Sequence, residues 1–146
     1  MHASSHLVPD SLVVDTGPLV ASADRRDRWH RESLELLATH PGQLIVPQLV
    51  VAETAYLLAE RLGSRSALQF LGEIARGNLV TEPVAVVDWP RILDLAIRYR
   101  DFPLGTTDAS VIACAERLGI TTVATTDRRH FAAVRPRHTE AFDLLP

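Results

Sequence analysis

Lysine is missing from this chain of 146 residues, and all fifteen of its basic side chains are arginines. This absence excludes several functions that depend on a lysine, among them the phosphate-binding loop that ends in Gly-Lys, Schiff-base enzymes and two-component receiver domains. Cysteine is almost as scarce. Cys114 is the single one, and it lies in an apolar run, which predicts a buried side chain rather than a disulfide or a metal ligand.

Long apolar runs are also missing, because no stretch approaches the roughly 20 residues that a membrane helix needs. The first residues lack the basic start and apolar stretch of a signal peptide, so we expect a cytoplasmic protein. We expect residues 1–10 to form a disordered N-terminal extension and residues 11–146 to form one domain. The net charge of −3 provides no global electrostatic argument for nucleic-acid binding.

Short apolar runs alternate with helical patterns along the rest of the chain. The predicted strands cover 12–14, 44–46, 79–80, 122–124 and 141–144. The predicted helices begin at 17 and cover 29–38, 49–62, 64–77, 88–100, 105–118 and 130–134. We expect Ser64 and Asp88 to be N-caps and Gly119 to end its helix. This alternation predicts an α/β domain whose central parallel sheet is covered by helices on both faces.

Four acidic residues fall where predicted strands end or the following helices begin. Asp15 ends the first strand, Asp127 follows the strand 122–124, and Glu53 and Asp108 lie near the starts of two helices. In open parallel sheets this edge is where ligands bind. Asp108 also lies at the helical spacing of an apolar stripe that faces the core, where a carboxylate loses hydration.

Each acid also has an ordinary structural explanation: a strand-end turn, a helix N-terminus or a solvated helix position. Four carboxylates at one edge, however, would repel one another without a cation. Carboxylate oxygens without thiolates or imidazoles favour Mg²⁺, with Mn²⁺ as a possible substitute. Such cations commonly serve phosphate chemistry, so the residues predict a metal-dependent phosphodiesterase.

Four sequence stretches resemble the PIN-domain nucleases, and specifically the VapC toxins of bacterial toxin–antitoxin pairs. Together they run from Leu12 to about Pro136 and carry all four acids. The stretches are Val13-Val14-Asp15-Thr16-Gly17-Pro18-Leu19, Val50-Val51-Ala52-Glu53, Leu104-Gly105-Thr106-Thr107-Asp108-Ala109-Ser110 and Ala124-Thr125-Thr126-Asp127-Arg128-Arg129-His130-Phe131.

The resemblance implies a PIN-like fold and a magnesium-dependent endoribonuclease that a cognate VapB-type antitoxin inhibits. It implies that Asp15 and Asp108 are the principal metal ligands, with Glu53 close by and Asp127 completing the catalytic set. Thr16 and Thr125 would support these carboxylates. The resemblance also implies RNA as the substrate, and we expect a homodimer, since two-fold symmetry is the commonest in soluble oligomers.

Clustered arginines near the predicted site suit a nuclease. Arg25 follows the first helix, and Arg128 and Arg129 adjoin Asp127, so all three could hold backbone phosphates of the substrate. For any one of them a solvated basic loop is an equally good explanation. Trp29 and Trp89 could stack on bases, although core packing or a partner interface is the simpler explanation.

Two other functions compete with this interpretation. Asp15-Thr16-Gly17 is also the triplet of aspartic proteases, but those enzymes need an all-β fold and a second triplet. Magnesium dependence, as opposed to acid-optimum peptide cleavage, would separate the two. The other alternative is a PIN domain that binds partners without cleaving RNA. Loss of growth arrest in an Asp15→Asn variant would exclude it.

Overall fold

Residues 10–146 are described by a computed structural model, and they form five strands and seven helices. The strands are β1 (Leu12–Val14), β2 (Leu44–Pro47), β3 (Val80–Glu82), β4 (Thr122–Ala124) and β5 (Asp143–Leu145). The helices are α1 (Thr16–Ala23), α2 (His30–Thr39), α3 (Gln48–Leu62), α4 (Ser64–Ala75), α5 (Asp88–Arg98), α6 (Thr106–Leu118) and α7 (Arg128–Ala133). The predicted disordered extension over residues 1–10 lies outside the described residues, apart from Asp10.

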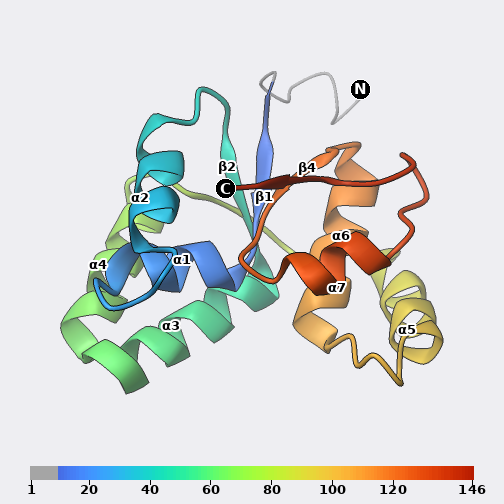
Figure 1. The fold of residues 1–146 in the computed structure, drawn as a ribbon, viewed down its shortest axis with the longest axis horizontal. Helices are drawn as coiled ribbons and strands as arrows, with labels where there is room; N and C mark the ends of the chain where they lie inside the picture. Colours follow the sequence, from blue (N-terminus) through green and yellow to red (C-terminus); the bar gives the residue numbers. More distant parts are fainter. Residues whose placement is uncertain (1–9) are drawn as a thin grey trace.

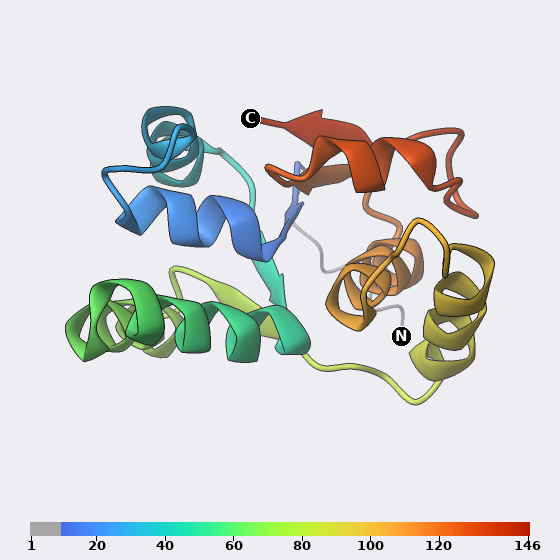
Figure 2. The ribbon, with the colours of Figure 1, turned by 60° about the horizontal axis from the view of Figure 1, so that its bottom comes forward.

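All strand pairings are parallel, in the order β3-β2-β1-β4-β5. Helices α1–α4 gather on one side of the sheet and α5–α7 on the other (Figures 1 and 2). The predicted α/β architecture is therefore confirmed. The chain starts in the middle of the sheet, moves outward to β3, and returns to the other side of β1, so two βα turns meet at the centre of one sheet edge.

The core is built from the central strands and from α6. All three residues of β1 are fully buried, as expected for a parallel strand with helices on both faces. In α6 seven consecutive residues, 109–115, are buried, because this helix packs between the sheet and α5. Cys114 lies among them, as predicted, and burial raises the pKa of its thiol to about 12.

Ion pairs attach α5 to α6. The buried guanidinium of Arg91 donates to both carboxylate oxygens of Glu116, at 2.8 and 2.9 Å, and to Asp94 at 2.7 Å. Arg117 donates to Asp88 at 3.0 Å and to Glu82 at 2.9 Å. These contacts fix α6, the helix whose first turn carries Asp108.

Two predicted N-caps are wrong. Ser64 is the first residue of α4, and Gly63, the single residue between α3 and α4, takes the cap position with a φ of 99°, a conformation that favours glycine. Asp88 is likewise the first residue of α5, with Val87 before it. Its carboxylate accepts instead from Ala85 N–H and from Arg117. Gly119 does end α6, in the left-handed conformation that favours glycine. Across the described residues, we find no helix long and apolar enough to cross a membrane.

Candidate metal centre

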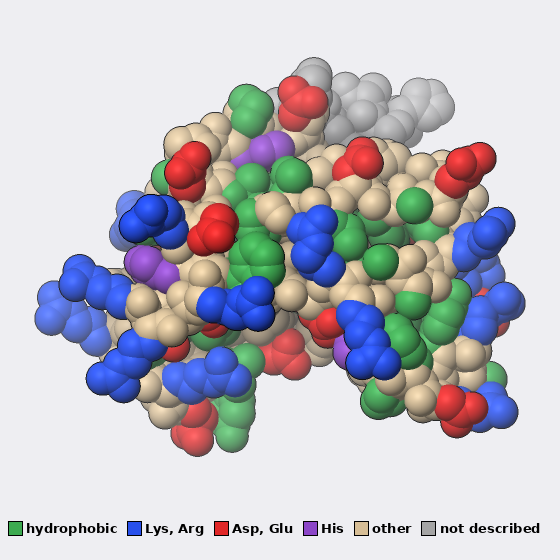
Figure 3. Space-filling view, viewed as in Figure 1, with side chains coloured by type: hydrophobic (Ala, Val, Ile, Leu, Met, Phe, Trp, Pro, Cys, Tyr) green, Lys and Arg blue, Asp and Glu red, His purple; other side chains and the backbone are tan. Residues whose placement is uncertain are grey.

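The four predicted acids lie on neighbouring elements at the carboxyl edge of the sheet. Asp15 follows β1 and precedes α1, and Asp127 precedes α7, shortly after β4. The Asp15 N–H donates to the carbonyl of Ala124, the last residue of β4, at 2.9 Å. Figure 3 shows acidic side chains gathered in a notch of the surface between the two groups of helices. The fold thus brings chain segments more than a hundred residues apart to one place.

Asp15 is the most buried of the four acids, with 4% of its surface exposed. Burial, together with the negative charges of Asp108 and Glu53, raises the pKa of its carboxyl from 3.8 to about 7. The hydroxyl of Thr125 donates to Asp15 Oδ2 at 2.9 Å and opposes that rise by stabilising the ionised form. Thr125 therefore contacts one of the carboxylates that the resemblance implies it would support.

Asp108 lies in the first turn of α6, half-buried beside the other acids. Burial, together with the negative charges of Asp127 and Glu53, raises the pKa of its carboxyl to about 6. Glu53 itself is exposed on α3 and accepts a hydrogen bond from the Thr16 hydroxyl at 2.7 Å. Asp108 is therefore within electrostatic reach of each of the other three acids.

His130 is a member of the cluster that the sequence analysis missed. One ligand atom from each of Asp108, Asp127 and His130 lies within 4.8 Å of the other two. The His130 ring nitrogen Nδ1 bonds to Asp127 Oδ2, and the His130 N–H donates to Asp127 Oδ1 at 3.4 Å. The signal was present in the sequence: a residue three positions after a helix N-cap turns back toward the capping carboxylate.

The donor set fits a hard divalent cation. The carboxylates of buried Asp15 and half-buried Asp108 have raised pKa values, so a positive charge beside them would stabilise their ionised forms most. Glu53 and Asp127 add further oxygen donors, so the site offers the ligands that Mg²⁺ and Mn²⁺ prefer. The parallel α/β sheet also removes the aspartic protease alternative, which requires an all-β framework.

The three predicted substrate-binding arginines occupy different places. Arg129 lies next to the site, with its guanidinium 5.5 Å from the centre of the Phe102 ring. Arg128 is exposed and donates to the carbonyl of Pro146 at 2.7 Å. Arg25 is exposed beyond the far end of α1, about 12 Å of helix away from Asp15. The structure therefore brings Arg129, but not Arg25, to the acids.

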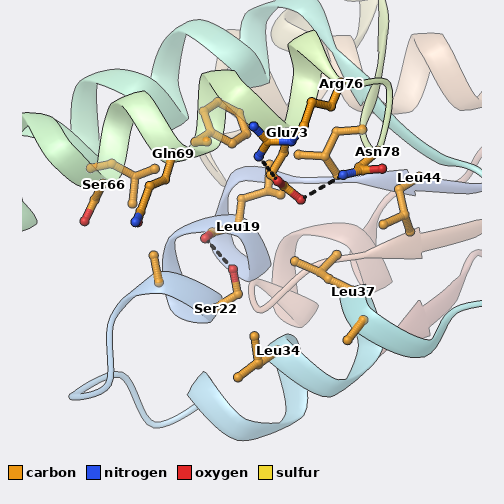
Figure 4. Close-up of a pocket in the computed structure, with 15 residues that line it drawn as sticks. Leu19, Ser22, Leu34, Leu37, Leu44, Ser66, Gln69, Glu73, Arg76 and Asn78 are labelled. Carbon is orange, nitrogen blue, oxygen red and sulfur yellow. Dashed lines mark hydrogen bonds and ion pairs between the residues drawn. The ribbon is translucent and has the colours of Figure 1, made fainter.

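A second feature lies at the end of α1 that is farther from Asp15. It is a groove of about 540 Å³ between α1 and α2 on one side and α4 on the other (Figure 4). Its walls are mainly apolar, with Leu19, Leu34, Leu37 and Phe70 among them. Glu73 stands at its polar end, bonded to Arg76 and, at 3.4 Å, to Asn78. We call this feature the α1–α4 groove.

Comparisons with known proteins find relatives over most of the chain. The model of the PIN domain matches residues 12–135. The chain is 31% identical to ribonuclease VapC26 of Mycobacterium tuberculosis over 135 residues, which is 92% of this chain and all of that protein.

Solved structures show the same fold. The crystal structure of Mycobacterium tuberculosis VapC20, described as a toxin that cleaves the sarcin-ricin loop, has a TM-score of 0.71 and 22% identity, covering 77% of this chain and 86% of that chain. The VapBC2 complex of Rickettsia felis, bound to promoter DNA, has a TM-score of 0.66 and 16% identity, covering 92% of this chain and 96% of that chain.

Proposed function

The chain belongs to the PIN-domain family, among its VapC-type members, and we propose that it is a magnesium-dependent endoribonuclease, the toxin of a toxin–antitoxin pair. The observation that carries the proposal is the convergence of four carboxylates, two of them with pKa values raised to about 6 and about 7. Such a cluster is unfavourable by itself and becomes favourable around a divalent cation.

Asp15 and Asp108 would hold the cation, with Glu53 and Asp127 beside them. Bound there, Mg²⁺ would lower the pKa of an attacking water and offset the charge that develops on the phosphate. The hydroxyl groups of Thr125 and Thr16 orient two of these carboxylates by hydrogen bonds. Thr125 fixes one oxygen of Asp15, and Thr16 fixes one oxygen of Glu53, so the remaining oxygens are left for the metal.

RNA is the substrate we propose, because one relative named above is described as a ribonuclease and another as a toxin that cleaves the sarcin-ricin loop. The net charge of −3 favours local phosphate contacts, for which Arg129 is the best placed of the predicted arginines. We therefore expect selective cleavage at exposed single-stranded sites of structured RNA, in the cytoplasm. Comparable cleavage of double-stranded DNA would contradict this.

A VapB-type antitoxin is the partner we propose for the α1–α4 groove. Structural relatives of this chain were solved as toxin–antitoxin complexes, among them the Rickettsia felis pair. The groove is mainly apolar, as the docking site of an amphipathic helix is, and α1 runs from it to Thr16 and Asp15. An antitoxin segment bound there could extend an arginine to the acids and replace the metal's charge.

A homodimer through α5 is the assembly we propose. Trp89, Leu93 and Ile97 follow one another at intervals of four residues on the outer face of α5, and they are 48%, 61% and 53% exposed. Val86 and Val87, just before the helix, are more exposed still. A continuous apolar stripe of this kind commonly marks a protein interface.

The test of the function uses Asp108→Asn, which keeps the side-chain shape but removes the charge. We expect the wild-type protein to cleave RNA only with added Mg²⁺ or Mn²⁺, and the variant to lose this cleavage without loss of thermal stability. Circular dichroism in metal-free buffer provides the folding control. Full RNase activity of the variant at limiting Mg²⁺ would show that the metal assignment is wrong. Growth arrest that survives Asp15→Asn would favour the non-cleaving alternative.

A further inference from the structure

His130 and Asp127 form a local unit at the outer side of the metal centre. Both oxygens of Asp127 accept from His130: Oδ2 from the ring nitrogen Nδ1 and Oδ1 from the backbone N–H. The Asp127 N–H in turn donates to the Thr125 hydroxyl at 3.0 Å, and that hydroxyl donates to Asp15. One chain of hydrogen bonds thus links the innermost acid, Asp15, to His130.

The His130 ring is itself held in place. It packs against the Phe102 ring in a T-shaped arrangement, with ring centres 4.7 Å apart and planes at 87°. The guanidinium of Arg129 lies over the same Phe102 ring, 5.5 Å from its centre. Phe102 belongs to the segment between α5 and α6, so this contact joins that segment to the start of α7. The imidazole therefore has little freedom to turn away from Asp127.

We propose that His130 is a positioning residue for the metal centre, one that orients the Asp127 carboxylate toward Asp108 for cation binding. Asp127 is more exposed than His130, with 42% of its side chain accessible against 24% for His130. A short carboxylate at that exposure samples several orientations unless a neighbour holds it. Hydrogen-bond partners of metal ligands typically contribute 10–100-fold to metal affinity. The proposal rests on the proposed function, because it assumes that the acids bind a cation.

The geometry allows a sharp choice of variants. The Nδ1 atom of histidine stands three bonds from Cα, like the side-chain nitrogen of asparagine. The Nε2 atom stands one bond further out, like that of glutamine. His130→Asn can therefore keep the bond to Asp127, whereas His130→Ala removes it and His130→Gln misplaces it. His40→Ala is the matched control. His40 follows α2 and precedes β2, so it lies toward the amino ends of the strands, away from the acids at their carboxyl ends.

The experiment measures the binding of Mg²⁺ and Mn²⁺ to the full-length chain by isothermal titration calorimetry. We expect His130→Ala and His130→Gln to bind about 10–100-fold more weakly than wild type, and His130→Asn and His40→Ala to bind within a few-fold of it. Phe102→Ala, which frees the imidazole without removing it, should show an intermediate loss. Thermal unfolding in EDTA checks that each variant is folded.

Three outcomes would overturn the proposal. Wild-type affinity in His130→Ala would show that Asp127 needs no partner. Rescue by glutamine and not by asparagine would show that His130 acts through Nε2, as a ligand. Nitrogen coupling from an imidazole in the electron spin-echo spectrum of bound Mn²⁺ would show direct ligation as well. Absence of any divalent-cation binding by the wild-type chain would instead refute the proposed function, on which this inference depends.

Discussion

Asp15 is the residue at which burial and charge oppose each other most directly. Its carboxyl is almost fully buried, and its pKa is raised from 3.8 to about 7. An acid whose pKa is raised on folding binds more protons in the folded state than in the unfolded state. The free energy of unfolding therefore falls as pH rises between these two values, and the full penalty is present above about pH 7.

We predict that the metal-free protein is more stable at about pH 5 than at pH 8, by up to roughly 3 kcal/mol from Asp15 alone, since the free energy of unfolding falls by about 1.4 kcal/mol per pH unit between pH 5 and about pH 7. Thermal or urea unfolding in EDTA across this range measures the effect. Asp15→Asn is the control, and it should flatten the slope. A metal-free stability that rises with pH in the wild type, and equally in the variant, would contradict the prediction.

The same residues predict how metal binding depends on pH. A cation binds the ionised carboxylates, so at pH values below about 7 it must displace protons from Asp15 and Asp108. The apparent Mg²⁺ affinity, and with it RNase activity at limiting Mg²⁺, should rise through this range and level off above it. Titration calorimetry in buffers of different ionisation enthalpy would detect the released protons. An affinity independent of pH would contradict the assignment.

At the level of single residues, the sequence predicted where the four acids lie better than it predicted which side chains contact them. Asp15 and Asp127 are predictable because they follow strands, and parallel strands end at one edge. The hydrogen bond from Thr125 to Asp15 joins residues 110 positions apart, so only the resemblance suggested it. His130 was not predicted, because Mg²⁺ prefers oxygen ligands and a histidine nitrogen is not expected among them.

At the level of elements, Gly17 shows how the turn after β1 approaches the turn after β4. A Cβ atom at Gly17 would lie 2.1 Å from Thr126 Oγ1 and 3.3 Å from Thr126 N. The first atom belongs to a short side chain and could move by rotation. The second belongs to the backbone that links Thr125 to Asp127, and it has less freedom. Glycine at this position therefore permits the close contact between α1 and the β4–α7 turn.

We predict that Gly17→Ala weakens Mg²⁺ binding and lowers stability by about 1–3 kcal/mol, a range typical of overpacked sites. This loss opposes the gain of up to about 1 kcal/mol that alanine usually brings to a helix. Gly105→Ala is the matched control, because a Cβ there meets nothing within 4 Å. Removing the nearest clashing atom in a Gly17→Ala/Thr126→Ala double variant should recover part of the loss. Equal metal affinity of Gly17→Ala and wild type would contradict the steric argument.

Helices and strands were predicted from periodicity, and the errors fall at their ends. Burial on both faces makes β1 and β2 continuous apolar runs, so their positions follow from the sequence. Ser64 and Asp88 have good capping chemistry, but tertiary contacts decided otherwise. The tight connection after α3 needs a glycine at the cap, and the Asp88 carboxylate pairs with Arg117, 29 residues away. Single-sequence propensity contains no information on such distant partners.

At the level of the whole molecule, the outer face of α5 suggests how two copies would associate. We predict that the wild-type protein sediments as a dimer and that Leu93→Glu sediments as a monomer, because the new charge would be buried against an apolar face. Leu93 is 61% exposed, so the substitution leaves the fold of one copy intact. Analytical ultracentrifugation measures the mass. A dimer that survives Leu93→Glu would place the interface elsewhere.

The α1–α4 groove provides the second surface on which a partner is proposed, and its separation from the α5 stripe allows the two to be tested independently. Leu34 lines the groove and is 49% exposed, so Leu34→Glu should leave the folded nuclease intact while placing a charge where an antitoxin's apolar side chains would bind.

We predict that the wild-type chain, co-purified with the product of the adjacent upstream reading frame, has no RNase activity at limiting Mg²⁺. Leu34→Glu should lose this partner and arrest growth even when the partner is co-expressed, yet remain a dimer. Leu93→Glu should show the reverse behaviour, losing the dimer but keeping the partner, and thus serves as the matched control. Full RNase activity in a stoichiometric complex would contradict inhibition by the partner, and a complex that survives Leu34→Glu would move its docking site away from the groove.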